Sequence, residues 1–122
     1  MLKFSKSLPI IIFIVILIGC TKPETWELSS QYRQYSHYRD RNTRAYALIV
    51  TTNDEETLRR IAEYYYDKFS DPEKRLIVDF FDDRRSTPDY SNGMELNEFQ
   101  EDHLIAHFED DPFLERKYFE MR

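Results

Sequence analysis

The sequence has few glycines and cysteines, and this excludes several kinds of functional site. Its 122 residues include two glycines, Gly19 and Gly93, and one cysteine, Cys20. A glycine-rich loop around a nucleotide phosphate is therefore excluded, and an internal disulfide would need a second cysteine. The Gly-x-Ser-x-Gly turn that carries the nucleophile of many hydrolases is missing as well. These absences indicate a protein that is not an enzyme and that uses no cofactor.

Positive charge is also scarce. The chain has 17 basic and 23 acidic residues, which gives a net charge of −6. Two of the basic residues, Lys3 and Lys6, precede Cys20, whereas every acidic residue follows it, so the chain after Cys20 is the more acidic part. Binding to nucleic acid depends on the neutralisation of phosphates by lysine and arginine. We therefore do not expect a nucleic-acid partner.

The only long apolar run lies near the N-terminus. It follows Lys3 and Lys6, extends from Leu8 to Leu17, and is followed by the small residue Gly19. A helix that crosses the hydrocarbon core of a membrane needs about 20 apolar residues, so this run is short for a permanent span. A basic start, a short apolar centre and a small residue are typical of a secretory signal peptide. We predict that residues 1–19 are such a peptide.

The segment Leu17-Ile18-Gly19-Cys20 resembles the lipobox of bacterial lipoproteins. This resemblance implies that the thiol of Cys20 receives a diacylglycerol, that the leader is cut just before Cys20, and that acyl chains such as palmitate hold the protein on a membrane. Thr21 stands where an aspartate often signals retention at the inner membrane. The resemblance thus favours the periplasmic face of the outer membrane in a diderm bacterium. The alternative is that Cys20 is an ordinary thiol at the end of a plain membrane anchor.

The rest of the chain is long enough for one small domain. Residues 20–31 are mainly polar and show no periodicity, so we predict a tether between the lipid and the domain. Aromatic residues make up 16% of the sequence and provide bulk for a core. We predict that residues 32–122 fold as a single domain.

The centre of this domain shows a strand, a helix and a second strand. Residues 44–51 and 76–81 are mostly apolar and rich in β-branched or aromatic side chains, as in buried strands. Between them, Thr52 and Glu55 have the spacing of a capping box, Glu55 and Arg59 have that of a helical ion pair, and Pro72 ends the helix. An apolar stripe at helical spacing follows the cap, formed by Leu58, Ile61, Ala62, Tyr65 and Phe69. The pattern predicts a right-handed β-α-β unit with parallel strands.

The flanking segments complete a small mixed sheet. Residues 32–38 are predicted to form a strand, joined to the next by the polar turn at 40–43. The last quarter allows two interpretations: a helix beginning at Asn97, or a hairpin of residues 102–108 and 114–121, which is favoured because short apolar runs flank a turn-rich centre. The predicted fold class is therefore α+β, in the order β-β-α-β-β-β, with one amphipathic helix packed on the sheet.

The most basic stretch of the chain suggests a partner surface. Tyrosines and arginines alternate there, and the candidate contact residues are Tyr32, Arg33, Tyr35, Tyr38, Arg39 and Arg41. Arginine supplies positive charge and tyrosine supplies flat contact area, as in many interfaces. We predict contact with an anionic headgroup, a protein of the envelope or a polymer there. The alternative is that the tyrosines face the core and the arginines pair with acidic residues.

Two further clusters are candidates for metal binding or acid-base chemistry. His103 and His107 are four residues apart and suit a transition metal, but no third ligand is fixed by spacing, so surface histidines are the preferred interpretation. Asp79, Asp82 and Asp83 lie at the end of a predicted strand, where sites often form on α/β sheets. Because Arg84 and Arg85 follow directly, ion pairs at a solvated strand end are preferred there.

Taken together, these patterns predict a lipid-anchored binding or structural module at the bacterial cell envelope. Two other functions remain open. One is a metal-dependent enzyme or metal-binding protein that uses His103 and His107. The other is an accessory subunit of an envelope complex.

Overall fold

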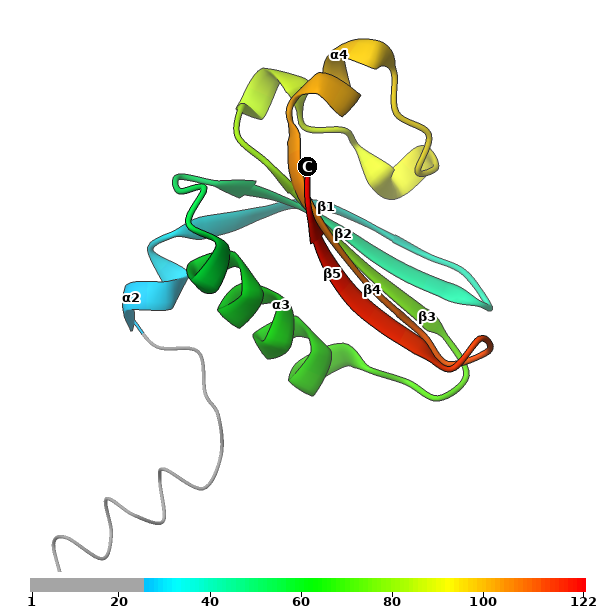
Figure 1. Ribbon diagram of the computed structural model, residues 1–122. Helices are drawn as coiled ribbons and strands as arrows, with labels where there is room; N and C mark the ends of the chain where they lie inside the picture. The colour runs from blue at the N-terminus through cyan, green and yellow to red at the C-terminus, as the bar shows by residue number, and fades with distance from the viewer. Residues whose placement is uncertain (1–25) are drawn as a thin grey trace, which may run out of the picture.

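The computed structural model describes residues 26–122 (Figure 1). The predicted signal peptide, the lipobox and Cys20 lie outside these residues. None of the helices within residues 26–122 combines the length and the apolar character that crossing a membrane requires.

Five strands form one mixed sheet, with the spatial order β1-β2-β3-β4-β5. Only β2 and β3 are parallel, and the other neighbours are antiparallel. The strands are β1 (Tyr32–Arg39), β2 (Thr43–Val50), β3 (Arg75–Phe81), β4 (Leu104–Asp111) and β5 (Arg116–Met121). The predicted α+β class with a small mixed sheet is confirmed.

The long helix α3 (Glu55–Phe69) connects the two parallel strands. Its N-cap is Asp54, whose carboxylate accepts from the N–H of Thr57 at 3.0 Å, and not Thr52 as predicted. The hydroxyl of Thr52 instead accepts from the N–H of Asp54 at 3.0 Å. Aspartate caps a helix as well as threonine does, so Asp54 can take the position that the sequence pattern assigns to Thr52. The predicted pair between Glu55 and Arg59 is present at 2.8 Å.

Helix α3 covers one face of the sheet, as Figure 1 shows. Its apolar stripe packs on side chains that alternate along the strands and point toward it. This core includes Tyr46, Leu48, Val50, Leu58, Ile61, Ala62, Tyr65, Leu76, Val78, Phe80, Ala106 and Phe108.

The opposite face is partly covered by the segment between β3 and β4. This segment contains the short 3-10 helices η1 (Arg84–Ser86) and η2 (Tyr90–Asn92). Tyr90 is buried against Ala45 and Ala47 of β2, two small side chains that allow the segment to approach the sheet closely. A smaller second core results on this face.

Two short helices correct the prediction of a single one. The first is α2 (Trp26–Ser29), which lies inside the predicted tether, and Leu28 is buried in the main core. The second is α4 (Glu98–Asp102), with a capping box of Asn97 and Gln100. The favoured hairpin is present as β4 and β5, so the last quarter of the chain combines the two interpretations: one turn of helix, then a hairpin.

Candidate functional site

The face of the sheet opposite α3 carries buried ionisable side chains. Asp79 on β3 is 6% exposed, and Glu109 and Asp111 on β4 are 7% and 6% exposed. Burial of a carboxylate is costly unless the charge is paired and hydrogen-bonded. We refer to the residues that provide this pairing across β3, β4 and β5 as the polar row: Arg75, Asp79, His107, Glu109 and Tyr118.

His107 lies at the centre of the polar row. In the register of β3 and β4 it stands opposite Asp79, and its Nδ1 atom is hydrogen-bonded to Oδ1 of that residue. Its Nε2 atom is 3.0 Å from Oε1 of Glu109, two residues further along β4. Both ring nitrogens are therefore engaged by carboxylates.

This environment favours the charged form of His107. Burial lowers the pKa of the imidazole, but the hydrogen bond and charge of Asp79, followed by those of Glu109, raise it by more, so that the net pKa is raised. The hydroxyl of Tyr118 donates to Oε1 of Glu109 at 3.3 Å. Partial burial and the charge of Glu109 raise the pKa of Tyr118, so this side chain remains a neutral donor.

Tyr90 closes the other end of the polar row, and sequence reasoning missed it. Its hydroxyl donates to Oδ2 of Asp79, and burial together with the charge of Asp79 raises the pKa of Tyr90 well above its ordinary value. Its backbone N–H donates to Oγ of Ser36 at 2.9 Å, and that hydroxyl donates to the carbonyl of Pro88 at 2.8 Å. These bonds anchor η2 to β1 and fix the position of Tyr90.

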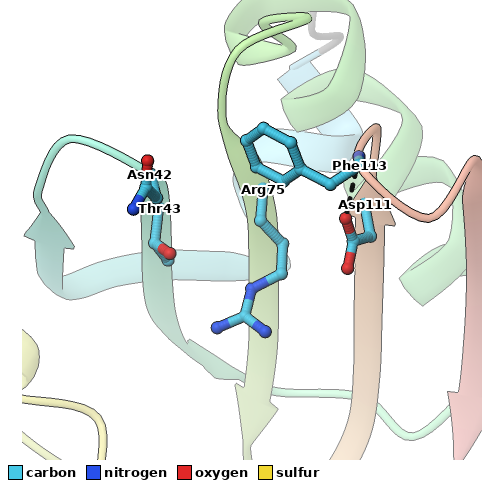
Figure 2. Close-up of a pocket in the computed structure, with 5 residues that line it drawn as sticks. All are labelled: Asn42, Thr43, Arg75, Asp111 and Phe113. Atoms are coloured by element: carbon cyan, nitrogen blue, oxygen red, sulfur yellow. Dashed lines mark hydrogen bonds between the residues drawn. The ribbon is translucent and has the colours of Figure 1, made fainter.

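A pocket of about 340 Å³ lies beside Arg75 at the start of β3 (Figure 2). Arg75 lies 3.8 Å from Oε2 of Glu109, and its buried Nε atom has no hydrogen-bond partner within residues 26–122. The carboxylate of Asp111 accepts from the N–H of Phe113 at 3.0 Å. The pocket is lined by Asn42, Thr43, Arg75, Asp111 and Phe113, and we call it the Arg75 pocket. Its one arginine is balanced by nearby carboxylates.

The two histidines predicted as a metal pair contact different aspartates. His103 follows α4, and its Nδ1 atom is 2.8 Å from Oδ1 of Asp82, whereas His107 contacts Asp79. Within residues 26–122, no three His, Cys, Asp or Glu side chains are grouped so as to hold a metal ion. The third aspartate of the predicted strand-end cluster, Asp83, caps η1 and pairs with Arg85 at 3.2 Å.

The three tyrosines of the predicted partner surface lie in different environments. The pairing of β1 with β2 is irregular between Gln34 and Ser36, so Tyr35 is a bulge residue and the alternation of faces changes there. Tyr32 packs against the core under α3, and Tyr38 packs against the second core. Tyr35 is 42% exposed. One of the three rings is thus left as an open contact surface.

The arginines of the same stretch remain exposed. Arg33, Arg39 and Arg41 have no ion-pair or hydrogen-bond partner for their guanidinium groups in the described part of the chain. Arg33 lines a pocket of about 420 Å³ together with Arg84 of η1. We call this the Arg33–Arg84 pocket; its other lining residues are Ser30, Tyr32, Ile49 and Thr51.

No family model, curated protein or solved structure matches this chain. Its function is therefore inferred from the exposed arginines, the two pockets and the polar row.

Proposed function

We propose that this chain is a membrane-anchored bacterial lipoprotein and that its folded part is a binding module at the cell envelope. The resemblance of Leu17-Ile18-Gly19-Cys20 to a lipobox supports the anchor. Lipid on Cys20 would hold the domain within a short distance of the membrane and raise its effective concentration for a partner there. Thr21 supports the outer membrane as the location in a diderm organism.

One observation favours a binding function: the edge strand that follows the predicted tether presents arginines whose guanidinium groups have no ion-pair or hydrogen-bond partner among residues 26–122. Arg33 and Arg39 lie on β1, and Arg41 lies in the turn after it. The planar guanidinium group matches carboxylate and phosphate geometry, so these side chains suit an anionic partner. Arg33 stands opposite Ile49 on the face away from α3, whereas Arg39 stands opposite Arg44, whose guanidinium group donates to the carbonyl of Phe69 on the α3 side. The two arginines therefore flank the edge of β1 from both faces of the sheet. With the exposed ring of Tyr35, this edge is the contact surface that we propose for an envelope protein or polymer.

The ionisable side chains that could serve in catalysis, those of the polar row, contact one another. A general base needs an unoccupied basic atom within reach of its substrate, and both nitrogens of His107 are engaged by Asp79 and Glu109. This geometry supports a binding or structural role over an enzymatic one. We interpret the five strands and α3 as the β-β-α-β-β-β core of the module, with α2 and α4 as short additions.

The anchor is tested by expression of the full chain in a diderm bacterium beside its Cys20→Ser variant. Intact mass and membrane fractionation are measured. We expect the wild type to lose residues 1–19, to gain the mass of a lipid and to sediment with the outer membrane, and we expect the variant to do none of these. If both proteins keep the leader, or if both remain in the soluble fraction, the lipoprotein assignment is wrong.

The same cells test the contact surface by chemical cross-linking and affinity capture. A triple variant, Arg33→Ser, Arg39→Ser and Arg41→Ser, is expected to lose cross-linked partners that the wild type retains. A matched control changes Arg59, Arg60 and Arg116 to Ser, which removes the same charge from α3 and β5. Equal capture by wild type and the first variant would contradict a role of this surface.

A further inference from the structure

Two arginines that are distant in sequence meet at one pocket. Arg33 lies on β1 opposite Ile49 of β2, and Arg84 belongs to η1, which follows β3. Val50 and Leu48 point into the core under α3, so Ile49, which alternates with them, lies on the face away from that helix. The Arg33–Arg84 pocket is therefore on the sheet face opposite α3.

Neither arginine of this pocket forms an ion pair with a residue in the described part of the chain. Within residues 26–122, no carboxylate pairs with Arg33 or with Arg84, whereas the next residue, Arg85, pairs with Asp83 at 3.2 Å. Two guanidinium groups that line the same pocket repel each other. Acidic residues outnumber basic ones in the sequence, and yet none of those that the structure describes pairs with either arginine here. An anion bound between the two side chains would remove this repulsion.

The lining of the pocket indicates what kind of anion fits. Guanidinium groups bind phosphate through paired N–H donors, which gives both strength and geometric selectivity. Beside them, Ile49 offers apolar contact for the carbon atoms attached to a phosphate. The volume of about 420 Å³ lies in the range of small-ligand sites. We propose that the Arg33–Arg84 pocket binds the phosphate group of an anionic membrane lipid.

The position of the pocket relative to the predicted anchor supports a lipid as the source of the phosphate. This step rests on the proposed lipidation of Cys20. Ser30 lines the pocket, and the ten or so residues from Cys20 to Ser30 span at most roughly 35 Å when fully extended. A lipid-anchored chain thus keeps the pocket close to headgroups, where even weak binding becomes effective.

The proposal is tested by isothermal titration calorimetry, in which each probe is titrated into the purified full chain in maltoside micelles. Two probes separate the sources of phosphate: dihexanoyl phosphatidylglycerol and inorganic phosphate. We expect the lipid to bind at least tenfold more tightly than inorganic phosphate. We expect Arg33→Gln and Arg84→Gln each to weaken lipid binding by tenfold or more. Arg85→Gln is the matched control, because it removes the same charge one residue away, and it should change the affinity less than twofold.

Several results would overturn the proposal. If neither probe binds, or if Arg84→Gln and Arg85→Gln weaken binding equally, the pocket is not a phosphate site. If inorganic phosphate binds as tightly as the lipid, the source of the phosphate is a soluble compound and the lipid assignment is wrong. The result is independent of the anchoring experiment. If the wild type proves not to be lipid-anchored but still shows Arg84-dependent binding, the lipoprotein function is disproved and the phosphate site is retained.

Discussion

The face of the sheet under α3 is lined by apolar side chains, whereas the opposite face carries charged ones between β3 and β5. Leu48, Val78 and Phe80 are fully buried on the first face, where the favourable term is the removal of apolar surface from water. On the second face, Asp79 and Glu109 are buried to a similar degree and depend on specific partners. The first face is therefore sensitive to volume and the second to charge.

The covering elements explain this difference. Helix α3 is an amphipathic rod with a continuous apolar stripe, and it needs an apolar surface to cover. The second face is covered only in part, by η2 and its neighbouring segment, and there the sheet provides the small side chains of Ala45 and Ala47. Tyr90 is the buried residue of this covering segment that contacts the polar row, through its hydrogen bond to Asp79. Ionisable groups beside such a partial cover remain close to water while their partners keep them in place.

The largest expected effect comes from loss of volume on the apolar face. Phe80→Ala removes a fully buried ring and should lower the free energy of unfolding by about 3–5 kcal/mol, as measured by urea denaturation followed by circular dichroism. Phe99→Ala is the matched control, because that ring is 51% exposed and its loss should cost less than about 1 kcal/mol. Equal losses in the two variants would contradict the assigned core.

A smaller but still large effect is expected from one carboxylate of the polar row. Asp79→Ala removes the acceptor of both Tyr90 and His107 and leaves the buried hydroxyl of Tyr90 and the half-buried Nδ1 of His107 without a partner. We expect a loss of about 2–3 kcal/mol in the same measurement. Asp82→Ala removes the other aspartate that contacts a histidine, His103, at an exposed site, and it should cost at most about 1 kcal/mol. A polar row without structural importance would give equal, small losses.

Helix α3 and the apolar strands that it covers were predictable from the sequence. The stripe of α3 and the apolar strands on either side of it have clear periodicity, because each buries one continuous surface against its neighbours. The cap was misplaced by two residues, since Thr52 and Asp54 both have side chains that accept from backbone N–H groups. The single turn of α4 is recognisable from Asn97, but the sequence pattern presents it as an alternative to the hairpin, although the chain has room for both.

The side-chain partners were not predictable, because they depend on the register and on the path of a loop. The bulge at Tyr35 follows from how β1 pairs with β2, and no spacing of tyrosines reveals it. His103 and His107 are four residues apart, but α4 ends before the first and β4 contains the second, and the two side chains contact different aspartates. Tyr90 reaches Asp79 through an irregular segment whose course the sequence does not specify.

The smallest effect we predict is a dependence of stability on pH that arises from the polar row. The pKa of His107 is raised in the folded protein above its ordinary value of 6.5. Between these two pKa values the folded state binds a proton that the unfolded state has lost, so stability falls as the pH rises. The contribution of His107 is complete below about pH 6.5 and disappears as the pH passes through the raised pKa. Tyr90 and Tyr118 continue to donate to the carboxylates of Asp79 and Glu109 over this pH range. The loss of stability with rising pH should therefore be smaller than the loss in Asp79→Ala.

The measurement is the free energy of unfolding of the wild type, His107→Gln and His103→Gln at intervals from pH 6 to pH 9. The groups that face His107 are Asp79, Glu109 and Tyr118, with Glu120 opposite it in the register of β4 and β5. We expect the wild type and His103→Gln to lose stability together as the pH rises, and we expect His107→Gln to show a flatter profile. A wild-type slope that persists in His107→Gln would show that another group is responsible, since removal of the imidazole removes the only proton that this mechanism can release.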